Sequence, residues 1–347
     1  MYCCREERGC EMTIEIRDFH FDEFEEFGDA FVDAGWKNDY MQLEKGHFRG
    51  RMLFTGSDST QISRCVWEKR LRHRGLQPKG TIVLGVTLSQ QGGTGTYLGA
   101  PIEFDTVIIQ RGEDRLEIFS APTWDATSLV IPESEFEDQI AALTQRAPEN
   151  IMKHRGLAKM SGPQSARLRQ ACRGYFSAAS MLQRSPDLGS PLEAMAADLV
   201  SLVIRVIVDS QFESGPPPNV SRRLEIIRKT EEFAESFPNR SLRVPDVCRH
   251  VGTSERNLRY AFEDLAGISP AAYLKAHRLS RVHTALLEAD PSEMLVKTIA
   301  YEHRFWHLGQ FSRDYRLAFG ERPSETLARH ERNCASSGID SMLRIRS

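Results

Sequence analysis

Residues 252–273 read GTSERNLRYAFEDLAGISPAAY, and this stretch decides the C-terminal fold. Gly252-Thr253-Ser254 predicts a tight turn that ends in a helix cap, because a serine side chain accepts a hydrogen bond from the free N–H groups of a first helical turn. Helices are therefore predicted on both sides, at Val244–Val251 and Glu255–Ala266, with Gly267 ending the second. Two short helices joined by a small-residue turn are the signature of a helix-turn-helix unit.

The two faces of the second helix differ in character. Apolar side chains that can form the small core between the two helices are Val247, Val251, Leu258, Phe262 and Leu265. Arg256, Arg259, Tyr260 and Glu263 fall on the opposite face. A planar arginine fork can donate to the O6 and N7 atoms of guanine, so this face suits the DNA major groove. Many helical hairpins that never bind DNA share this pattern, so one unit alone does not decide the function.

The arrangement occurs a second time around residues 305–323, FWHLGQFSRDYRLAFGERP. A long helix is predicted from Ser269-Pro270 to about Ala289, and Asp290-Pro291-Ser292 breaks it. Glu293–His303 and His307–Phe319 are then predicted as the second helix pair. Two such units on one rigid helix can enter successive major grooves, about 34 Å apart on one face of DNA.

The last of these helices also has two faces. Phe311, Tyr315 and Phe319 recur every four residues, so they form a stripe that must be buried. Gln310 and Arg313 then face outward. Gly320 and Pro323 are predicted to end the unit.

The clearest domain boundary is Ser214-Gly215-Pro216-Pro217-Pro218-Asn219. Three prolines remove three backbone donors and favour an extended linker. The sequence therefore predicts an N-terminal domain at 12–213, a linker at 214–219, a helical domain at 220–332 and a disordered tail at 333–347.

Residues 41–131 predict an antiparallel β-barrel or sandwich, because short β-rich segments alternate there with Gly, Asp, Ser and Pro turns. The predicted strands are Met41–Glu44, Gly50–Thr55, Gln61–Glu68, Thr81–Leu88, Thr96–Leu98, Thr106–Gln110, Leu116–Ser120 and Ser128–Ile131. Residues 12–40 are predicted as an irregular lead-in. Its four phenylalanines, spaced as in a short amphipathic helix, are Phe19, Phe21, Phe24 and Phe27.

Helices flank this β-rich region at about 133–211. They are predicted at Glu133–Thr144, Ser165–Leu182 and Pro191–Gln211, and the last has apolar residues at helical spacing. The two long helices either form a homodimer interface or only cover the barrel, and the sequence leaves both interpretations open.

Composition excludes several classes of protein. The chain has 347 residues, 40% of them hydrophobic, without a run long enough for a membrane span. The seven cysteines contain no C-x-x-C pair, which favours a reducing cytoplasm over a disulfide framework. Residues 220–347 hold 21 Lys and Arg against 17 Asp and Glu, within a chain of net charge −3. Residues 1–11 show no structural pattern, so Met12 is a candidate for the natural first residue of the protein.

The spaced positions over residues 222–330 resemble the DNA-binding domain of AraC/XylS-type bacterial regulators. The residues that carry the resemblance are Ser254, Leu258, Phe262, Gly267, Ser269, Pro270, Tyr273, Arg278, Leu279, Ile299, Ala300, Phe305, Phe311, Tyr315, Phe319, Gly320 and Pro323. The resemblance implies a regulator, an activator by preference, with promoter DNA and RNA polymerase as partners. It also implies that a small effector binds a cupin-like N-terminal barrel, so that the fold class is α+β.

Carried over by position, the resemblance implies base contacts from Arg256, Arg259 and Tyr260 in the first unit. In the second unit it implies contacts from Leu308, Gly309, Gln310 and Arg313. The chain departs from the family pattern at Arg304, where glycine is usual, and at Val282, where alanine is usual. The run from Phe305 to Phe311 resembles the subgroup of the ethanolamine-operon regulator.

Three other functions remain as alternatives, and one of them is a pure interaction scaffold, which predicts no salt-dependent DNA binding. A metal-dependent cupin enzyme would need clustered histidines, yet residues 41–131 hold only His47 and His73, and His73 lies in a basic run that suits a solvated loop or strand end. A cysteine-zinc DNA-repair regulator would use Cys3, Cys4 and Cys10, which lack a second spaced pair. We therefore expect no enzyme activity, cofactor or metal. Trp67 and Trp124 are candidates for stacking on the effector or for plain core packing.

Overall fold

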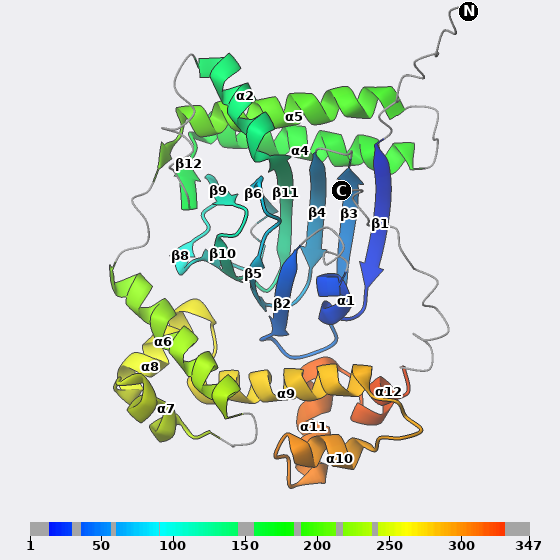
Figure 1. The fold of residues 1–347 in the computed structure, drawn as a ribbon, viewed down its shortest axis with the longest axis vertical. Coiled ribbons are helices and arrows are strands. Elements are labelled where there is room, and N and C mark those ends of the chain that lie inside the picture. The colour runs from blue at the N-terminus through cyan, green and yellow to red at the C-terminus, as the bar shows by residue number, and fades with distance from the viewer. Residues whose placement is uncertain are drawn as a thin grey trace, which may run out of the picture.

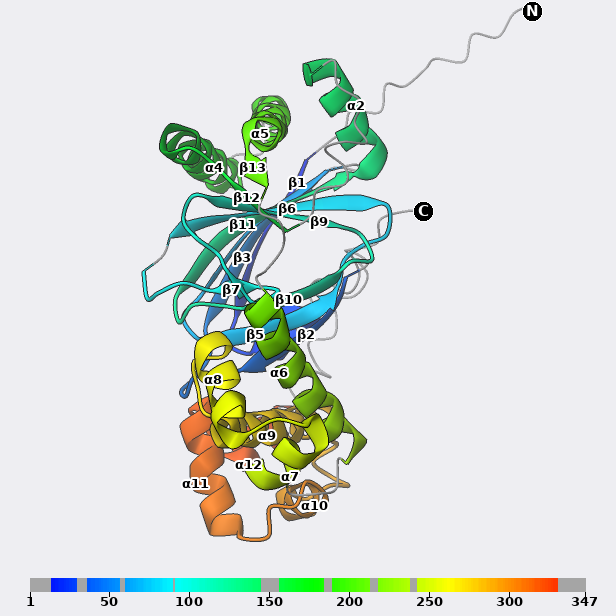
Figure 2. The ribbon, with the colours of Figure 1, turned by 90° about the vertical axis from the view of Figure 1, so that its left-hand side faces the viewer.

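The computed structural model describes residues 14–29, 36–56, 60–89, 91–144, 156–183, 189–212, 218–237 and 242–329. These residues form four layers, which follow one another from top to bottom in Figure 1 and in Figure 2. A pair of long helices covers a large antiparallel sheet, a smaller sheet lies beneath it, and a domain of helices packs under the smaller sheet. The α+β class with a C-terminal helical domain is confirmed.

The larger sheet has eight strands among the described residues, in the order β1-β3-β4-β11-β6-β9-β12-β13. Their bounds are β1 Glu15–Phe21, β3 Gly50–Gly56, β4 Gln61–Trp67, β6 Thr81–Ser89, β9 Thr106–Arg111, β11 Trp124–Pro132, β12 Gly156–Lys159 and β13 Gln211–Phe212. Successive side chains on a strand point to opposite faces. On β6, Ile82, Leu84 and Val86 accordingly pack toward the covering helices, and Val83 points between the sheets.

The smaller sheet has the order β2-β5-β10-β7-β8. Its strands are β2 Lys37–Gln42, β5 Leu71–Leu76, β7 Thr96–Tyr97, β8 Ala100–Pro101 and β10 Arg115–Phe119. The strands thus form two facing sheets and not one closed barrel. The basic run around His73, predicted as a solvated loop or strand end, is the body of a strand, β5, in which Arg72 is only 1% exposed.

Three helices cover the outer face of the larger sheet. They are α2 (Glu133–Thr144), α4 (Gly162–Leu182) and α5 (Gly189–Asp209), at or within a few residues of their predicted bounds. Their buried side chains share one apolar cluster with the sheet. The two long helices thus cover the larger sheet, and the homodimer interface stays a prediction.

The C-terminal domain consists of helices. They are α6 Pro218–Ser236, α7 Val244–Val251, α8 Glu255–Leu265, α9 Pro270–Glu288, α10 Val296–Glu302, α11 Leu308–Phe319 and α12 Pro323–Leu327. The Ser269 side chain caps α9 by accepting from the Ala272 N–H. The helix α12 was not predicted. The predicted linker overlaps α6 at Pro218 and Asn219, and its first four residues lie outside the described residues.

The lead-in prediction is wrong in part. Phe19 and Phe21 lie on β1, while Phe24 and Phe27 lie on the short helix α1 (Phe24–Asp29). The spacing of the four rings suits a helix, but β1 pairs in register with β3 over its whole length, which fixes the first two in a strand. The cysteines at 3, 4, 10 and 334, the candidate start Met12 and the predicted tail lie outside the described residues.

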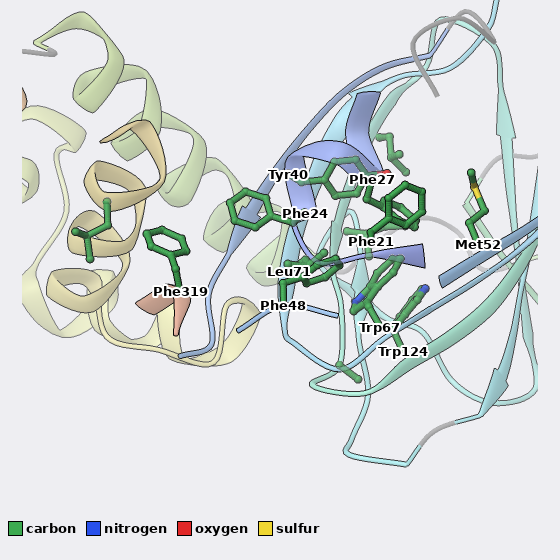
Figure 3. Close-up of a cluster of buried hydrophobic side chains, with 14 of the residues drawn as sticks. Phe21, Phe24, Phe27, Tyr40, Phe48, Met52, Trp67, Leu71, Trp124 and Phe319 are labelled. Atoms are coloured by element: carbon green, nitrogen blue, oxygen red, sulfur yellow. The ribbon is translucent and has the colours of Figure 1, made fainter. Parts of the chain in front are cut away.

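The N-terminal sheets and the helical domain share a buried aromatic contact. Phe24 of α1 lies against Phe319 of α11, with ring centroids 6.3 Å apart, and against His283 of α9 at 5.8 Å. Figure 3 shows Phe24 and Phe319 facing each other between the two parts. No helix among the described residues is long and apolar enough to cross a membrane.

The substitution Phe311→Ala should lower the free energy of unfolding by about 3–5 kcal/mol, because it leaves a cavity beside Phe305 and Tyr315. Leu317→Ala on the exposed side of the same helix is the matched control, and we expect a change of less than about 0.5 kcal/mol. Chemical denaturation of the full chain measures both. Equal effects at the two positions would contradict a buried role for Phe311.

Candidate nucleic-acid interface and ligand cavity

The first helix-turn-helix unit is α7, the turn at residues 252–254, and α8. Gly252 adopts a left-handed φ of 71° and ends α7, and the Ser254 side chain accepts from the Asn257 N–H at 3.2 Å. Val247, Leu258 and Phe262 are fully buried between the helices. The sequence therefore fixes both the turn and the crossing of the two helices.

The outer face of α8 carries the side chains that the sequence analysis assigned to base contact. Arg256, Arg259 and Tyr260 are all exposed. The Arg256 guanidinium donates to the Tyr260 hydroxyl at 3.2 Å and lies 5.4 Å from the centre of its ring. This contact holds a cation and an aromatic ring together on the surface, an arrangement that suits phosphates or base edges.

The second unit presents a polar chain on α11. The Gln310 amide donates to Asp314 at 2.9 Å, and Arg313 donates to Gln310 at 3.0 Å. Lys275 of α9 pairs with the same Asp314 carboxylate at 2.7 Å. The two predicted contact residues are therefore exposed and aligned with each other.

Leu308 and Gly309 differ from these two. Leu308 is half-buried and packs against the apolar core, so its side chain supports the helix start. Gly309 is exposed, and a Cβ added there would meet no atom within 4 Å. The surface of α11 is thus open at Gly309, where backbone can approach a ligand closely.

The sequence analysis missed two exposed aromatic residues beside α11. Trp306 is 58% exposed and stacks on Tyr301 of α10, with ring centroids 5.7 Å apart. Neither residue belongs to the buried stripe of α11. The one sequence signal for this pair is a tryptophan in a turn between two helices. Arg304, in the same turn, has a φ of +64°, a conformation that favours glycine.

A cavity of about 100 Å³ lies between the two sheets of the N-terminal part. Trp67 and Trp124 line it and stack on each other, with ring centroids 5.6 Å apart. Phe27, Trp36 and Tyr40 complete an aromatic wall. Figure 3 shows the two stacked tryptophans. The structure thus brings both effector candidates to one cavity.

Polar groups in the cavity have unused hydrogen-bonding capacity. The Asn38 amide, His73 Nε2 and Gln77 Oε1 have no hydrogen-bond partner among the described residues. Burial lowers the pKa of His73 to about 3, so its ring is neutral at physiological pH. The described residues that line the cavity include no Asp, Glu, Lys or Arg. The sequence analysis missed these three residues because their common location depends on strand register.

A buried charged cluster lies on the other side of the smaller sheet, against the helical domain. The Arg72 guanidinium contacts Glu231 of α6 at 2.9 Å, Tyr273 of α9 at 3.2 Å and Asp39 of β2 at 2.6 Å. Tyr273 also donates to Glu231. Arg72, Glu231 and Tyr273 are each about 1% exposed.

Two further charged groups extend this cluster. Arg74 contacts Glu231 at 3.1 Å and Glu235 at 3.0 Å. Glu117 of β10 is buried beside them, and neither of its carboxylate oxygens has a hydrogen-bond partner among the described residues. Burial, together with the Glu231 charge, raises the pKa of Glu117 to about 7.

Three comparisons with known proteins bear on this geometry. The helix-turn-helix domain family matches residues 247–329. The chain is 30% identical over 153 residues to the XylDLEGF operon transcriptional activator 2 of Pseudomonas putida, covering 43% of this chain and 98% of that relative. This chain belongs to the AraC/XylS family of transcription regulators.

Two other proteins are similar over shorter parts. The probable thc operon regulatory protein of Rhodococcus erythropolis is 36% identical over 102 residues, 29% of this chain and 31% of that relative. A crystal structure of a probable AraC family transcriptional regulator from Rhodopseudomonas palustris is 38% identical over 30% of this chain and 96% of that protein, with a TM-score of 0.28. The chain thus matches about a third of the first relative's length, and nearly all of the second protein.

Membership of the AraC/XylS family confirms the resemblance inferred from the spaced residues and makes the chain a DNA-binding transcription regulator. The ethanolamine subgroup and the individual base contacts stay predictions. The relatives named here are regulators. The cysteines of the zinc alternative lie outside the described residues.

The metal-enzyme alternative gains no support from the two histidines it would use. His73 lines the cavity, and His47 lies beside Asp22, 3.3 Å away. Among the described residues, the side chains close enough to share a metal are Glu23, Glu25 and His283. Although burial lowers the pKa of His283, the two carboxylates raise it overall, and Glu23 also pairs with Arg329. Ion pairing therefore accounts for this group.

Arg304→Gly should raise the free energy of unfolding by about 1 kcal/mol, because glycine adopts a positive φ without the Cβ clash that costs a larger residue 1–2 kcal/mol. The lost contact of Arg304 with Trp306 offsets part of this gain. Gly252→Ala, at a φ of 71°, is the control and should have the opposite sign. Urea denaturation measures both, and a destabilised Arg304→Gly variant would count against the prediction.

Glu117 should make stability depend on pH. Its folded pKa of about 7 lies above the ordinary value of 4.5, so the folded chain binds the proton more tightly. That contribution is fully present below pH 4.5 and is lost as pH rises through 7. Relative to Glu117→Gln, the wild type should lose up to about 3 kcal/mol between pH 4.5 and 8. Parallel unfolding curves for the two proteins across this range would refute the assignment.

Proposed function

We propose that this chain is a transcription activator that recognises promoter DNA through both helix-turn-helix units. Arg256, Arg259 and Tyr260 of α8 and Gln310 and Arg313 of α11 read base edges. The observation that carries the proposal is the arrangement of two units on one helix, α9, each with an exposed polar face. Exposed arginines on two such helices supply the direct readout that sequence specificity needs.

Regulation comes from a small effector in the N-terminal cavity. Stacked tryptophans on one wall favour a flat aromatic or apolar group, and the unpartnered atoms of Asn38, His73 and Gln77 favour one or two polar substituents. A charged ligand would be buried without a counter-ion, which costs several kcal/mol. The effector class is therefore a neutral molecule, and the cavity volume of about 100 Å³, smaller than the roughly 150 Å³ of a cavity that binds benzene, admits no more than one small ring.

Further partners follow from the same proposal. RNA polymerase binds the promoter-bound activator, and the protein acts in the cytoplasm, where its DNA is.

The outer faces of α4 and α5 form a homodimer interface. The groove between these helices carries Arg167 and Arg205 beside Asp198 and Asp209, charges that two copies related by symmetry can pair.

Arg259→Ala should weaken binding to the cognate promoter by about 1–3 kcal/mol and relax the preference at one base pair. Selection of bound genomic fragments followed by sequencing supplies the promoter, and gel-shift titration at fixed salt measures the affinity.

Lys79→Ala, which removes an exposed cation in the turn between β5 and β6 of the N-terminal part, is the matched control and should leave DNA affinity unchanged. Equal losses in both variants would mean that nonspecific charge accounts for binding. An unchanged Arg259→Ala would remove α8 from the interface.

A further inference from the structure

The smaller sheet separates the ligand cavity from the DNA-binding domain by a single layer of strands. The register aligns Tyr40 of β2, His73 of β5 and Ile118 of β10 as direct neighbours. All three line the cavity, and Tyr40 and His73 stack with ring centroids 4.3 Å apart. The same three strands therefore form one wall of the cavity.

The next residue on each strand points the other way, because strand side chains alternate. Asp39, Arg74 and Glu117 form one cross-strand row, and Met41, Arg72 and Phe119 form another. Met41 and Phe119 belong to the apolar cluster of α6, α8 and α9, and Arg72 makes the buried contacts with Glu231 and Tyr273. This face of the sheet is thus the docking surface of the DNA-binding domain.

The two faces cannot move independently. His73 and Arg72 are consecutive residues, and their Cα atoms are about 3.8 Å apart. At Gly75 the strands β2 and β5 lie so close that a Cβ would meet the Lys37 carbonyl oxygen at 2.3 Å. A shift of β5 that accommodates a ligand must therefore also shift the Arg72 guanidinium.

The contact on the far side is sensitive to such a shift. A buried ion pair is favourable only with good geometry, because both charges have left water. Arg72 and Glu231 hold each other through one close contact and the Tyr273 hydroxyl that bridges them. Parting this pair would leave Arg72 with Asp39 and Glu231 with Arg74, and it would release α6 and α9 from their present position against the sheet.

We propose that β2, β5 and β10 couple the cavity to the DNA-binding domain, so that a ligand held at Tyr40 and His73 changes DNA affinity through the Arg72–Glu231–Tyr273 contact. This inference rests on the proposed function and adds the route of regulation. Coupling between two binding equilibria is reciprocal, so DNA must change ligand affinity by the same factor.

The test uses the full chain, phenol as a neutral single-ring probe with one hydroxyl, and the selected promoter fragment. Calorimetry measures the phenol Kd with and without DNA, and gel shift measures the DNA Kd with and without phenol. For each ligand, the coupling ratio is its Kd without the other ligand divided by its Kd with it. In the wild type the coupling ratios for phenol and for DNA should be equal and differ from one by at least about fivefold. In Arg72→Met/Glu231→Gln, both ligands should still bind, and the ratio should fall to about one.

Two further variants make the result decisive. Tyr273→Phe keeps both charges and the ring but removes the bridging hydroxyl, and should reduce the ratio at least about twofold. Arg51→Met/Asp18→Leu removes an ion pair between β1 and β3 of the larger sheet, with a contact of 2.6 Å, and should keep the wild-type ratio.

The outcomes separate the two hypotheses. If phenol binds and the ratio survives in both Arg72→Met/Glu231→Gln and Tyr273→Phe, the route through the sheet is wrong and the proposed function stands. A ratio of one in the wild type also overturns the route. If the wild type binds DNA but not phenol, the proposed effector class fails and the route fails with it, while DNA recognition stands. If the wild type does not bind DNA, the proposed function itself fails.

Discussion

The buried contact between Arg72 and Glu231 determines how the two halves of this molecule are joined. A guanidinium and a carboxylate, both removed from water, contact each other at 2.9 Å, and Asp39 and Arg74 give each of them a second partner of opposite charge. Tyr273 bridges the two, so β5, α6 and α9 meet at one point. Such a pair contributes little net stability, but it permits few alternative arrangements. The placement of the DNA-binding domain under the smaller sheet follows from this constraint.

Aromatic packing adds to that constraint at the far end of α9. There the ring of His283 packs against both Phe24 and Phe319, and His283 contacts Glu23 at 2.8 Å. At each end of α9, a ring of the helix thus contacts a buried carboxylate: Tyr273 contacts Glu231, and His283 contacts Glu23. Because α9 also joins the two helix-turn-helix units, the N-terminal part holds the one element that sets their relative position. A regulator built this way can act on both units at once.

The sequence predicted the elements whose signals are local. The bounds of α7 and α2 agree with the structure, because serine caps, left-handed glycines and helical spacing act within a few residues. The strand β5 was missed, because its run of arginines indicates solvent unless their buried partner Glu231, more than 150 residues away, is known. Only part of the cavity lining was predicted, because the rest depends on contacts between residues far apart in the sequence. Trp67 and Trp124 stood out by type, but His73 joins them only through strand register.

The ion pair of Glu23 with Arg329 links positions 306 residues apart. During synthesis a chain emerges from its N-terminus, and early segments fold before later ones exist. Glu23, which lies just before α1, must therefore wait for almost the whole polypeptide before its partner Arg329 appears. Contacts so distant in sequence also slow folding, since the intervening loop must close first. The nascent protein thus acquires its final architecture only after the last described helix has left the ribosome.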